Sequence, residues 1–114
     1  MEKQYDMDKV FGNIEKRLRT NPEPIEGMEA VYLFELSGGD EGMYQLHLSE
    51  GEARVQKGEA DSVDCRIKMK KDDFMDMLLG KLNGTAAFMT GKLKVKGNMG
   101  LAMKLQNVLG SYET

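Results

Sequence analysis

The sequence GKLKVKGNMGLAMKLQ, residues 91–106, changes its hydrophobic period halfway along. In its first half Leu93 and Val95 alternate with three lysines, the pattern of a strand with one apolar and one polar face. Gly97-Asn98 ends this alternation, and from Met99 to about Leu109 apolar residues recur at helical spacing. The segment therefore predicts a strand followed directly by a helix.

The predicted final helix is apolar over a wide arc. At about 100° per residue its apolar side chains cover roughly 220°, whereas a helix packed on one side needs an arc of about 100°. Two explanations stay open: the helix is buried on two sides, or part of the arc faces the core and another part faces a cavity. Gln106 falls within the arc, where an unpaired amide costs about 1 to 3 kcal/mol. Its partner is either a neighbouring backbone group or the polar end of a bound lipid.

Upstream of this segment, a period of two predicts four more strands, near residues 30–36, 44–48, 53–56 and 63–70. Short loops containing glycine separate the first three runs. We expect the four strands to form an antiparallel meander with one wet face.

Helical spacing appears in two further regions. Residues 7–20 predict a helix with Asp6 as its N-cap, followed by an extended loop over residues 21–24. Asp72 is expected to cap a helix that ends at Asn83-Gly84, and Thr85 a short helical turn after it. The order of elements predicts an α+β fold, a five-stranded sheet with helices covering one face.

Composition limits the classes of protein that remain. A chain of 114 residues has room for one domain, residues 1–114, and 40% hydrophobic with 31% charged residues fits a globular protein. No apolar run approaches bilayer length and the chain begins polar, so we expect a cytoplasmic protein. Ten methionines and no tryptophan favour an interior or groove that adapts its shape.

The charge distribution and the scarcity of histidine and cysteine argue against nucleic-acid binding and metal binding. Residues 1–66 carry a net charge of −7 and residues 67–114 carry +4, which is not the basic domain typical of a nucleic-acid-binding protein. The sequence contains one histidine, His47, and one cysteine, Cys65, so we expect no metal, no cofactor and no disulfide within the chain. We expect a buried Cys65 and a solvated His47 on the polar face of its strand.

The run from Gly91 to Gln106 closely resembles the closing strand and helix of the sterol carrier protein type 2 (sterol-binding) domain family. The resemblance continues upstream through Phe88 and the 72–82 helix, and more loosely over the four strands. It implies a mainly antiparallel five-stranded sheet whose helices enclose an apolar tunnel for fatty acids, fatty acyl-CoA, phospholipids or sterols. The final residues 111–114, SYET, depart from the peroxisomal address that many relatives carry.

The resemblance also implies a set of tunnel-wall residues, each of which is alternatively ordinary core: Met77, Leu78, Leu82, Phe88, Met99, Ala102, Met103, Gln106 and Leu109. The lysine row Lys92, Lys94 and Lys96 is either a solvated face that protects a sheet edge, or a site of transient docking on anionic membranes.

We therefore expect a non-enzymatic intracellular lipid carrier that binds a lipid or acyl-CoA ligand as a monomer or weak homodimer. The alternative is a protein interaction or dimerisation module of the same fold with no dedicated lipid cargo. A small enzyme acting on an acyl substrate would need a carboxylate or histidine beside the cavity. The strand pattern places His47 elsewhere.

Overall fold

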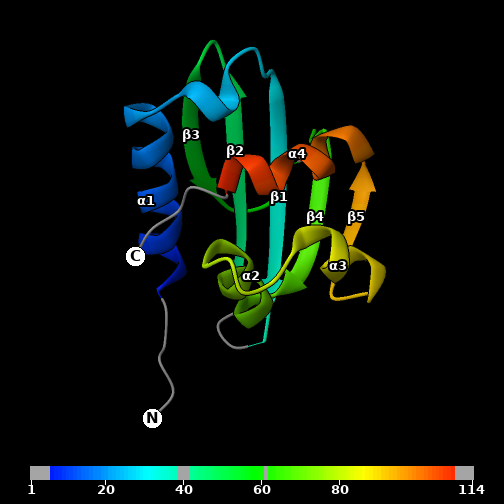
Figure 1. Cartoon of the computed structure of the whole chain (residues 1–114). Helices are drawn as coiled ribbons and strands as arrows, with labels where there is room; N and C mark the ends of the chain where they lie inside the picture. The colour runs from blue at the N-terminus through cyan, green and yellow to red at the C-terminus, as the bar shows by residue number, and fades with distance from the viewer. Residues whose placement is uncertain (1–5, 39–41, 61, 110–114) are drawn as a thin grey trace.

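The structure, a computed structural model, describes residues 6–38, 42–60 and 62–109, without the side chains of Gln106 and Asn107. Figure 1 shows the helices on one side of a twisted sheet, with α4 crossing in front of its centre. The elements in chain order are α1 (Met7–Thr20), the 3-10 helix η1 (Glu23–Ile25), β1 (Ala30–Ser37), β2 (Gly42–Ser49), β3 (Glu52–Lys57), β4 (Cys65–Lys70), α2 (Lys71–Leu78), α3 (Gly84–Met89), β5 (Leu93–Gly97) and α4 (Met99–Leu109).

The five strands lie in the order β3-β2-β1-β4-β5. β1 pairs antiparallel with β2, β2 with β3, and β4 with β5, whereas β1 and β4 are parallel. The expected α+β class with a mainly antiparallel sheet is confirmed. The expected four-strand meander is wrong. The connection after β3 crosses the sheet, so β4 pairs with β1 and not with β3.

The outer edge of β3 explains why β4 does not pair there. α1 lies along this edge, and two of its side chains bind the outward backbone groups of the strand (Figure 1). Glu15 Oε2 accepts a hydrogen bond from the Val55 amide at 2.7 Å, and Arg19 Nε donates to the Ala53 carbonyl at 3.0 Å. These bonds occupy positions that a further strand would need.

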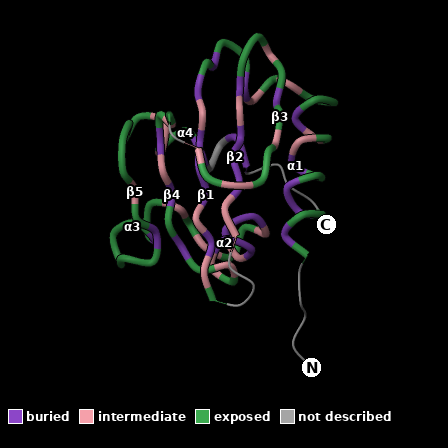
Figure 2. The backbone as a smooth tube through the Cα atoms, turned by 180° about the vertical axis from the view of Figure 1, so that it is seen from behind, coloured by how far each residue is buried: buried purple, intermediate pink, exposed green. Residues whose placement is uncertain are grey.

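The connection from β3 to β4 covers part of the sheet face that was expected to be wet. It crosses the side opposite the helices (Figure 2), where Gln45 Nε2 donates to the carbonyls of Gly58 and Glu59 at 3.1 Å each. Leu33 on this face is fully buried. His47 is half-buried, not solvated as predicted, and its Nε2 lies 2.8 Å from Gln45 Oε1. Burial lowers the pKa of His47.

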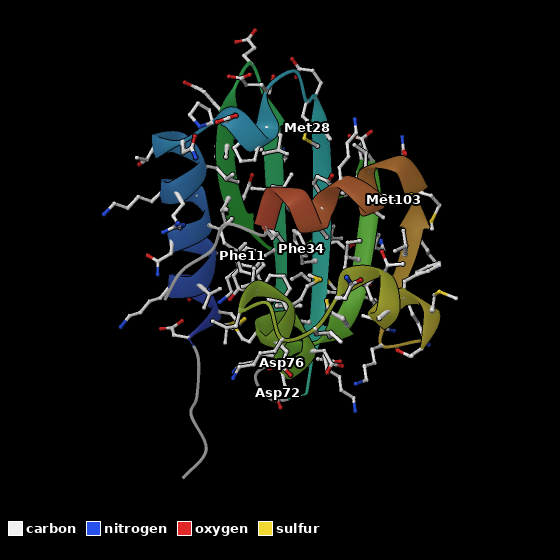
Figure 3. All side chains as sticks on the ribbon, viewed as in Figure 1. Phe11, Met28, Phe34, Asp72, Asp76 and Met103 are labelled. Carbon is white, nitrogen blue, oxygen red and sulfur yellow. The ribbon has the colours of Figure 1, made fainter. Side chains whose placement is uncertain are left out.

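The core lies between the sheet and the helices. Phe11 of α1 stacks on Tyr44 of β2 and on Phe74 of α2, with ring centroids 4.3 Å and 5.3 Å away. Figure 3 shows Phe11 beside Phe34 of β1. The Tyr44 hydroxyl donates to Asp8 Oδ1 at 2.6 Å, which together with Lys57 lowers the pKa of Asp8. Cys65 is buried as expected, and burial raises the pKa of its thiol to about 11.

Helix boundaries agree at both ends of the chain and differ in the middle. α1 has the predicted N-cap, because the Asp6 side chain accepts a hydrogen bond from the Asp8 amide at 2.9 Å. The loop after α1 contains η1 and is therefore not fully extended. α2 begins two residues earlier than expected, so Asp72 lies in its first turn and Lys70 holds the N-cap position.

The region between α2 and α3 corrects two further expectations. α2 ends at Leu78, and Gly80 follows in the left-handed region with φ of 78°. Asn83, not Thr85, caps α3: its side-chain oxygen accepts the amides of Thr85 at 2.8 Å and Ala86 at 3.2 Å. A short asparagine side chain reaches both free amides of a first helical turn, which is why it is favoured at this position.

Candidate functional site

An apolar cavity of about 380 Å³ lies between α3, β5 and α4, with α2 contributing one residue. Among the lining residues that the structure describes, Thr85 carries the only polar side-chain group. The lining residues are Met77, Gly84, Thr85, Phe88, Met89, Leu93, Val95, Met99, Ala102, Met103 and Leu105.

α4 contributes to both the core and the cavity. Val108 and Leu109 are buried in the core, Leu105 is buried where the core meets the cavity, and Met99 and Met103 are exposed on the cavity side. Of the two explanations offered for the wide apolar arc, the structure agrees with the second: one part of the arc faces the core and another part faces a cavity.

Tyr32 fixes the position of α4 on the sheet. Its hydroxyl donates a hydrogen bond of 2.7 Å to the Leu101 carbonyl in the first turn of the helix. The Tyr32 side chain is buried, and burial raises its pKa, so the hydroxyl stays protonated and remains a donor.

The cavity has a buried floor and an exposed mouth. Met77, Leu93 and Leu105 are 6% exposed or less and form the floor. Large hydrophobic side chains that are exposed in the described part of the chain all line this cavity: Phe88 (44%), Met89 (80%), Met99 (45%) and Met103 (77%). Figure 3 shows Met103 on α4, on the side of the molecule where β5 forms the sheet edge. These four residues are called the apolar rim below.

The described side chains of the lining include no acid, base or nucleophile beyond the Thr85 hydroxyl. Across the described residues, no group of three or more His, Cys, Asp or Glu side chains is placed to hold a metal ion. The described helices are each too short or too polar to cross a bilayer. The site can therefore bind an apolar molecule by burial and contact, with water excluded from its floor.

The structure brings together five of the predicted wall residues: Met77, Phe88, Met99, Ala102 and Met103. Leu78 and Leu109 are buried in the core away from the cavity lining, and Leu82 is half-buried against that core. Helical spacing placed these leucines on an apolar face, but the neighbours of that face depend on packing. The side chain of Gln106 lies outside the described residues.

Six lining residues were not predicted: Gly84, Thr85, Met89, Leu93, Val95 and Leu105. Leu93 and Val95 carried a usable signal, since they alternate with the lysines of β5 and must face the helices. Pairing this strand face with the arc of α4 would have identified both residues and Leu105.

The lysine row lies outside the cavity. Lys94 and Lys96 are exposed and alternate with Leu93 and Val95, so they project from the sheet face opposite the helices. Lys92 is exposed just before β5. The lysines do not line the cavity, but they lie on or beside the strand that forms its wall.

The fold and the site together define a small α+β domain that holds an apolar cavity between its edge strand and two helices. A model of this kind of domain, described as the SCP-2 sterol transfer family, matches residues 11–110. The chain belongs to this family, and the resemblance noted in residues 91–106 is confirmed.

Individual relatives agree with this assignment. The chain is 48% identical over 86 residues to human hydroxysteroid dehydrogenase-like protein 2, covering 75% of this chain and 21% of that protein. It is 38% identical over 103 residues to human sterol carrier protein 2, covering 87% and 19%. A solution structure of the sterol carrier protein domain 2 of Helicoverpa armigera is 30% identical, with a TM-score of 0.76 over 100% of this chain and 99% of that one.

The chain spans about a fifth of the length of these two human relatives. The word dehydrogenase in one of the names belongs to a protein of which this chain matches only 21%, so it assigns no reaction to the residues of this chain.

Proposed function

We propose that this chain is a non-enzymatic intracellular lipid carrier, a single domain that binds one lipid molecule with its hydrocarbon part in the cavity. The observation that carries the proposal is the 380 Å³ cavity with an almost wholly apolar lining in a member of this family. Burying hydrocarbon there is favourable by roughly 25 cal/mol for each Å² removed from water. Methionine side chains in the wall adapt their shape to different ligands.

The size and polarity of the cavity favour a ligand with one hydrocarbon chain, such as a fatty acid or the acyl part of acyl-CoA. The volume lies near the lower end of the roughly 300 to 1,000 Å³ that ligand pockets occupy. An ionised head group on the apolar floor would lose its hydration without gaining a partner. The head group therefore stays at the mouth, among the apolar rim and water, and phospholipids and sterols are weaker candidates.

Filling the cavity tests this proposal. Ala102 is half-buried and lines the cavity, so Ala102→Phe places a ring in the space for the ligand. Ala86→Phe on α3 is the matched control, because Ala86 is exposed and outside the lining. Both proteins are stripped of lipid and titrated with a fluorescent fatty acid, which is then displaced by palmitate, palmitoyl-CoA or cholesterol.

We expect saturable one-to-one binding by the unmodified protein and by Ala86→Phe, and affinity at least tenfold lower for Ala102→Phe, equivalent to about 1.4 kcal/mol. Selective displacement by palmitate would support a single-chain cargo. Equal affinity of the two folded variants would contradict binding in this cavity.

The apolar rim also favours one alternative, a module that pairs with a second protein or a second copy. Met89 and Met103 expose hydrophobic surface that such a partner would cover. Light scattering separates the two functions: a dimer that is indifferent to added fatty acid supports the interaction module, and a monomer that binds fatty acid supports the carrier.

A further inference from the structure

The apolar rim is the starting observation. Singly exposed hydrophobic residues are common on protein surfaces, but a gathered patch marks a site of interaction. Here the exposed large hydrophobic side chains of the described chain all gather at one cavity mouth, on α3 and α4. The patch and the cavity are thus one surface, and whatever covers the patch also faces the entrance.

The chain segment that forms most of this surface carries side-chain charges of one sign. From residue 77 to residue 112 the sequence contains no aspartate or glutamate and five lysines. All five are exposed: Lys81, Lys92, Lys94, Lys96 and Lys104. Since residues 1–66 carry −7, the molecule has opposite charges on two parts of its chain. An anionic surface would attract the part that carries the cavity and repel the remainder.

β5 places the lysines and the apolar rim at the same edge of the sheet. It is an edge strand, with the cavity on one face and Lys94 and Lys96 on the other. Lys104 lies on α4, next to Met103 of the rim. Long lysine stems can lie along apolar groups while their ammonium groups reach a charged layer. Lysines therefore lie on both the strand and the helix that form the cavity wall.

One pair in this row is unfavourable for the isolated sheet. Lys94 lies directly opposite Lys68 in the β4–β5 register, and like charges at opposed positions destabilise a sheet. By contrast, Arg66 on the same face is paired with Glu35 at 2.9 Å and Glu59 at 3.0 Å. On this sheet face, acidic side chains thus pair with Arg66 of β4, while Lys94 of β5 lies opposite another lysine.

We propose that this protein docks on anionic membranes through its cavity mouth. The apolar rim enters the boundary between head groups and acyl chains, and Lys92, Lys94, Lys96 and Lys104 contact anionic head groups. This inference rests on the proposed carrier function, since docking at the mouth lets a lipid pass between membrane and cavity without crossing water. A fluid lipid surface also suits flexible methionines, which fit no fixed shape.

Vesicle flotation tests the electrostatic half of the proposal. The protein is mixed with vesicles of phosphatidylcholine alone, or of equal parts phosphatidylcholine and phosphatidylserine. The variant Lys94→Gln/Lys96→Gln is compared with Lys9→Gln/Lys16→Gln, which removes the same charge from exposed positions of α1. We expect binding to phosphatidylserine vesicles to fall on the order of tenfold for the β5 variant and about twofold or less for the α1 variant. Salt should weaken the binding of the unmodified protein.

The apolar half is tested by Met89→Gln/Met103→Gln against Met89→Leu/Met103→Leu. Both pairs keep similar side-chain size, but only the glutamines are polar. We expect the glutamine variant to lose vesicle binding on the order of tenfold and the leucine variant to retain it. Equal binding by the two variants would overturn docking through the rim.

Fatty-acid titration without vesicles separates this inference from the carrier function. If the unmodified protein and the β5 lysine variant both bind fatty acid while only the unmodified protein floats with anionic vesicles, docking is supported. Fatty-acid binding without flotation overturns docking and leaves the carrier function standing. A concentration-dependent dimer that Met89→Gln/Met103→Gln dissolves, with no flotation, overturns docking in favour of a second copy as the occupant. Greater loss for Lys9→Gln/Lys16→Gln would place the contact on α1 and also overturn it.

Discussion

At the scale of single residues, Gly97 explains how β5 can end and α4 begin within two positions. Its φ is 107°, and a Cβ added there would lie 2.5 Å from the Asp64 carbonyl oxygen. The same carbonyl accepts a hydrogen bond from the Asn98 amide at 2.9 Å. Only glycine allows this backbone conformation and this close approach together. The Gly-Asn pair in residues 91–106 is therefore a structural requirement of the strand-to-helix turn.

Replacing Gly97 by alanine should lower the free energy of unfolding by about 2 kcal/mol or more, because both the φ angle and the contact with Asp64 become unfavourable. Gly12→Ala is the matched control. Gly12 lies inside α1 with nothing within 4 Å of an added Cβ, so this change should stabilise by about 0.5 to 1 kcal/mol. Urea denaturation measures both. Similar stability of the two variants would show that Gly97 is not constrained in solution.

At the scale of elements, the hydrogen bond from Tyr32 to Leu101 connects the centre of the sheet to α4. Because α4 forms one wall of the cavity, this bond connects the stability of the fold to the shape of the site. A comparable bond joins Tyr44 of β2 to Asp8 of α1 at 2.6 Å, but α1 does not line the cavity. Comparing substitutions of the two tyrosines therefore separates the effect of α4 position on ligand binding from the effect of overall stability.

Tyr32→Phe should lower the free energy of unfolding by about 1 kcal/mol, the usual net contribution of an intramolecular hydrogen bond. It should also speed hydrogen exchange of α4 amides and weaken fatty-acid binding severalfold. Tyr44→Phe should cost similar stability while leaving fatty-acid affinity unchanged. Exchange measured by mass spectrometry, together with the fluorescent titration, checks both outcomes. An equal loss of fatty-acid affinity in both variants would mean that the hydrogen bond from Tyr32 to α4 has no specific role in ligand binding.

At the scale of the whole molecule, the carrier function predicts linkage between ligand and stability. A ligand that binds only the folded state at about one hundred times its Kd stabilises that state by roughly 2.7 kcal/mol. For a domain of this size we expect palmitate at that concentration to raise Tm on the order of 10 °C. Differential scanning calorimetry of the lipid-free protein measures the shift. Ala102→Phe should show little change at the same palmitate concentration, and an unchanged Tm in the unmodified protein would argue against a bound lipid.

Sequence periodicity by itself determined the elements that depend on local geometry. The alternation over residues 92–96 and the helical spacing from Met99 to Leu109 identified β5 and α4, and Asp6 was recognised as the cap of α1. These features follow from neighbours along the chain: a period of two or 3.6 residues, and a side chain within reach of a nearby amide. The family resemblance rests on the same residues.

Tertiary structure decided what each apolar face contacts. Periodicity placed Leu78, Leu109 and Met103 on apolar faces alike, but packing buried the two leucines in the core and left Met103 exposed at the cavity mouth. The parallel pairing of β4 with β1 and the hydrogen bond from β3 to Glu15 of α1 likewise join distant parts of the chain. The cavity exists only where α3, β5 and α4 meet, because a pattern of hydrophobic residues specifies which side of an element avoids water and not which neighbour, or which ligand, covers it.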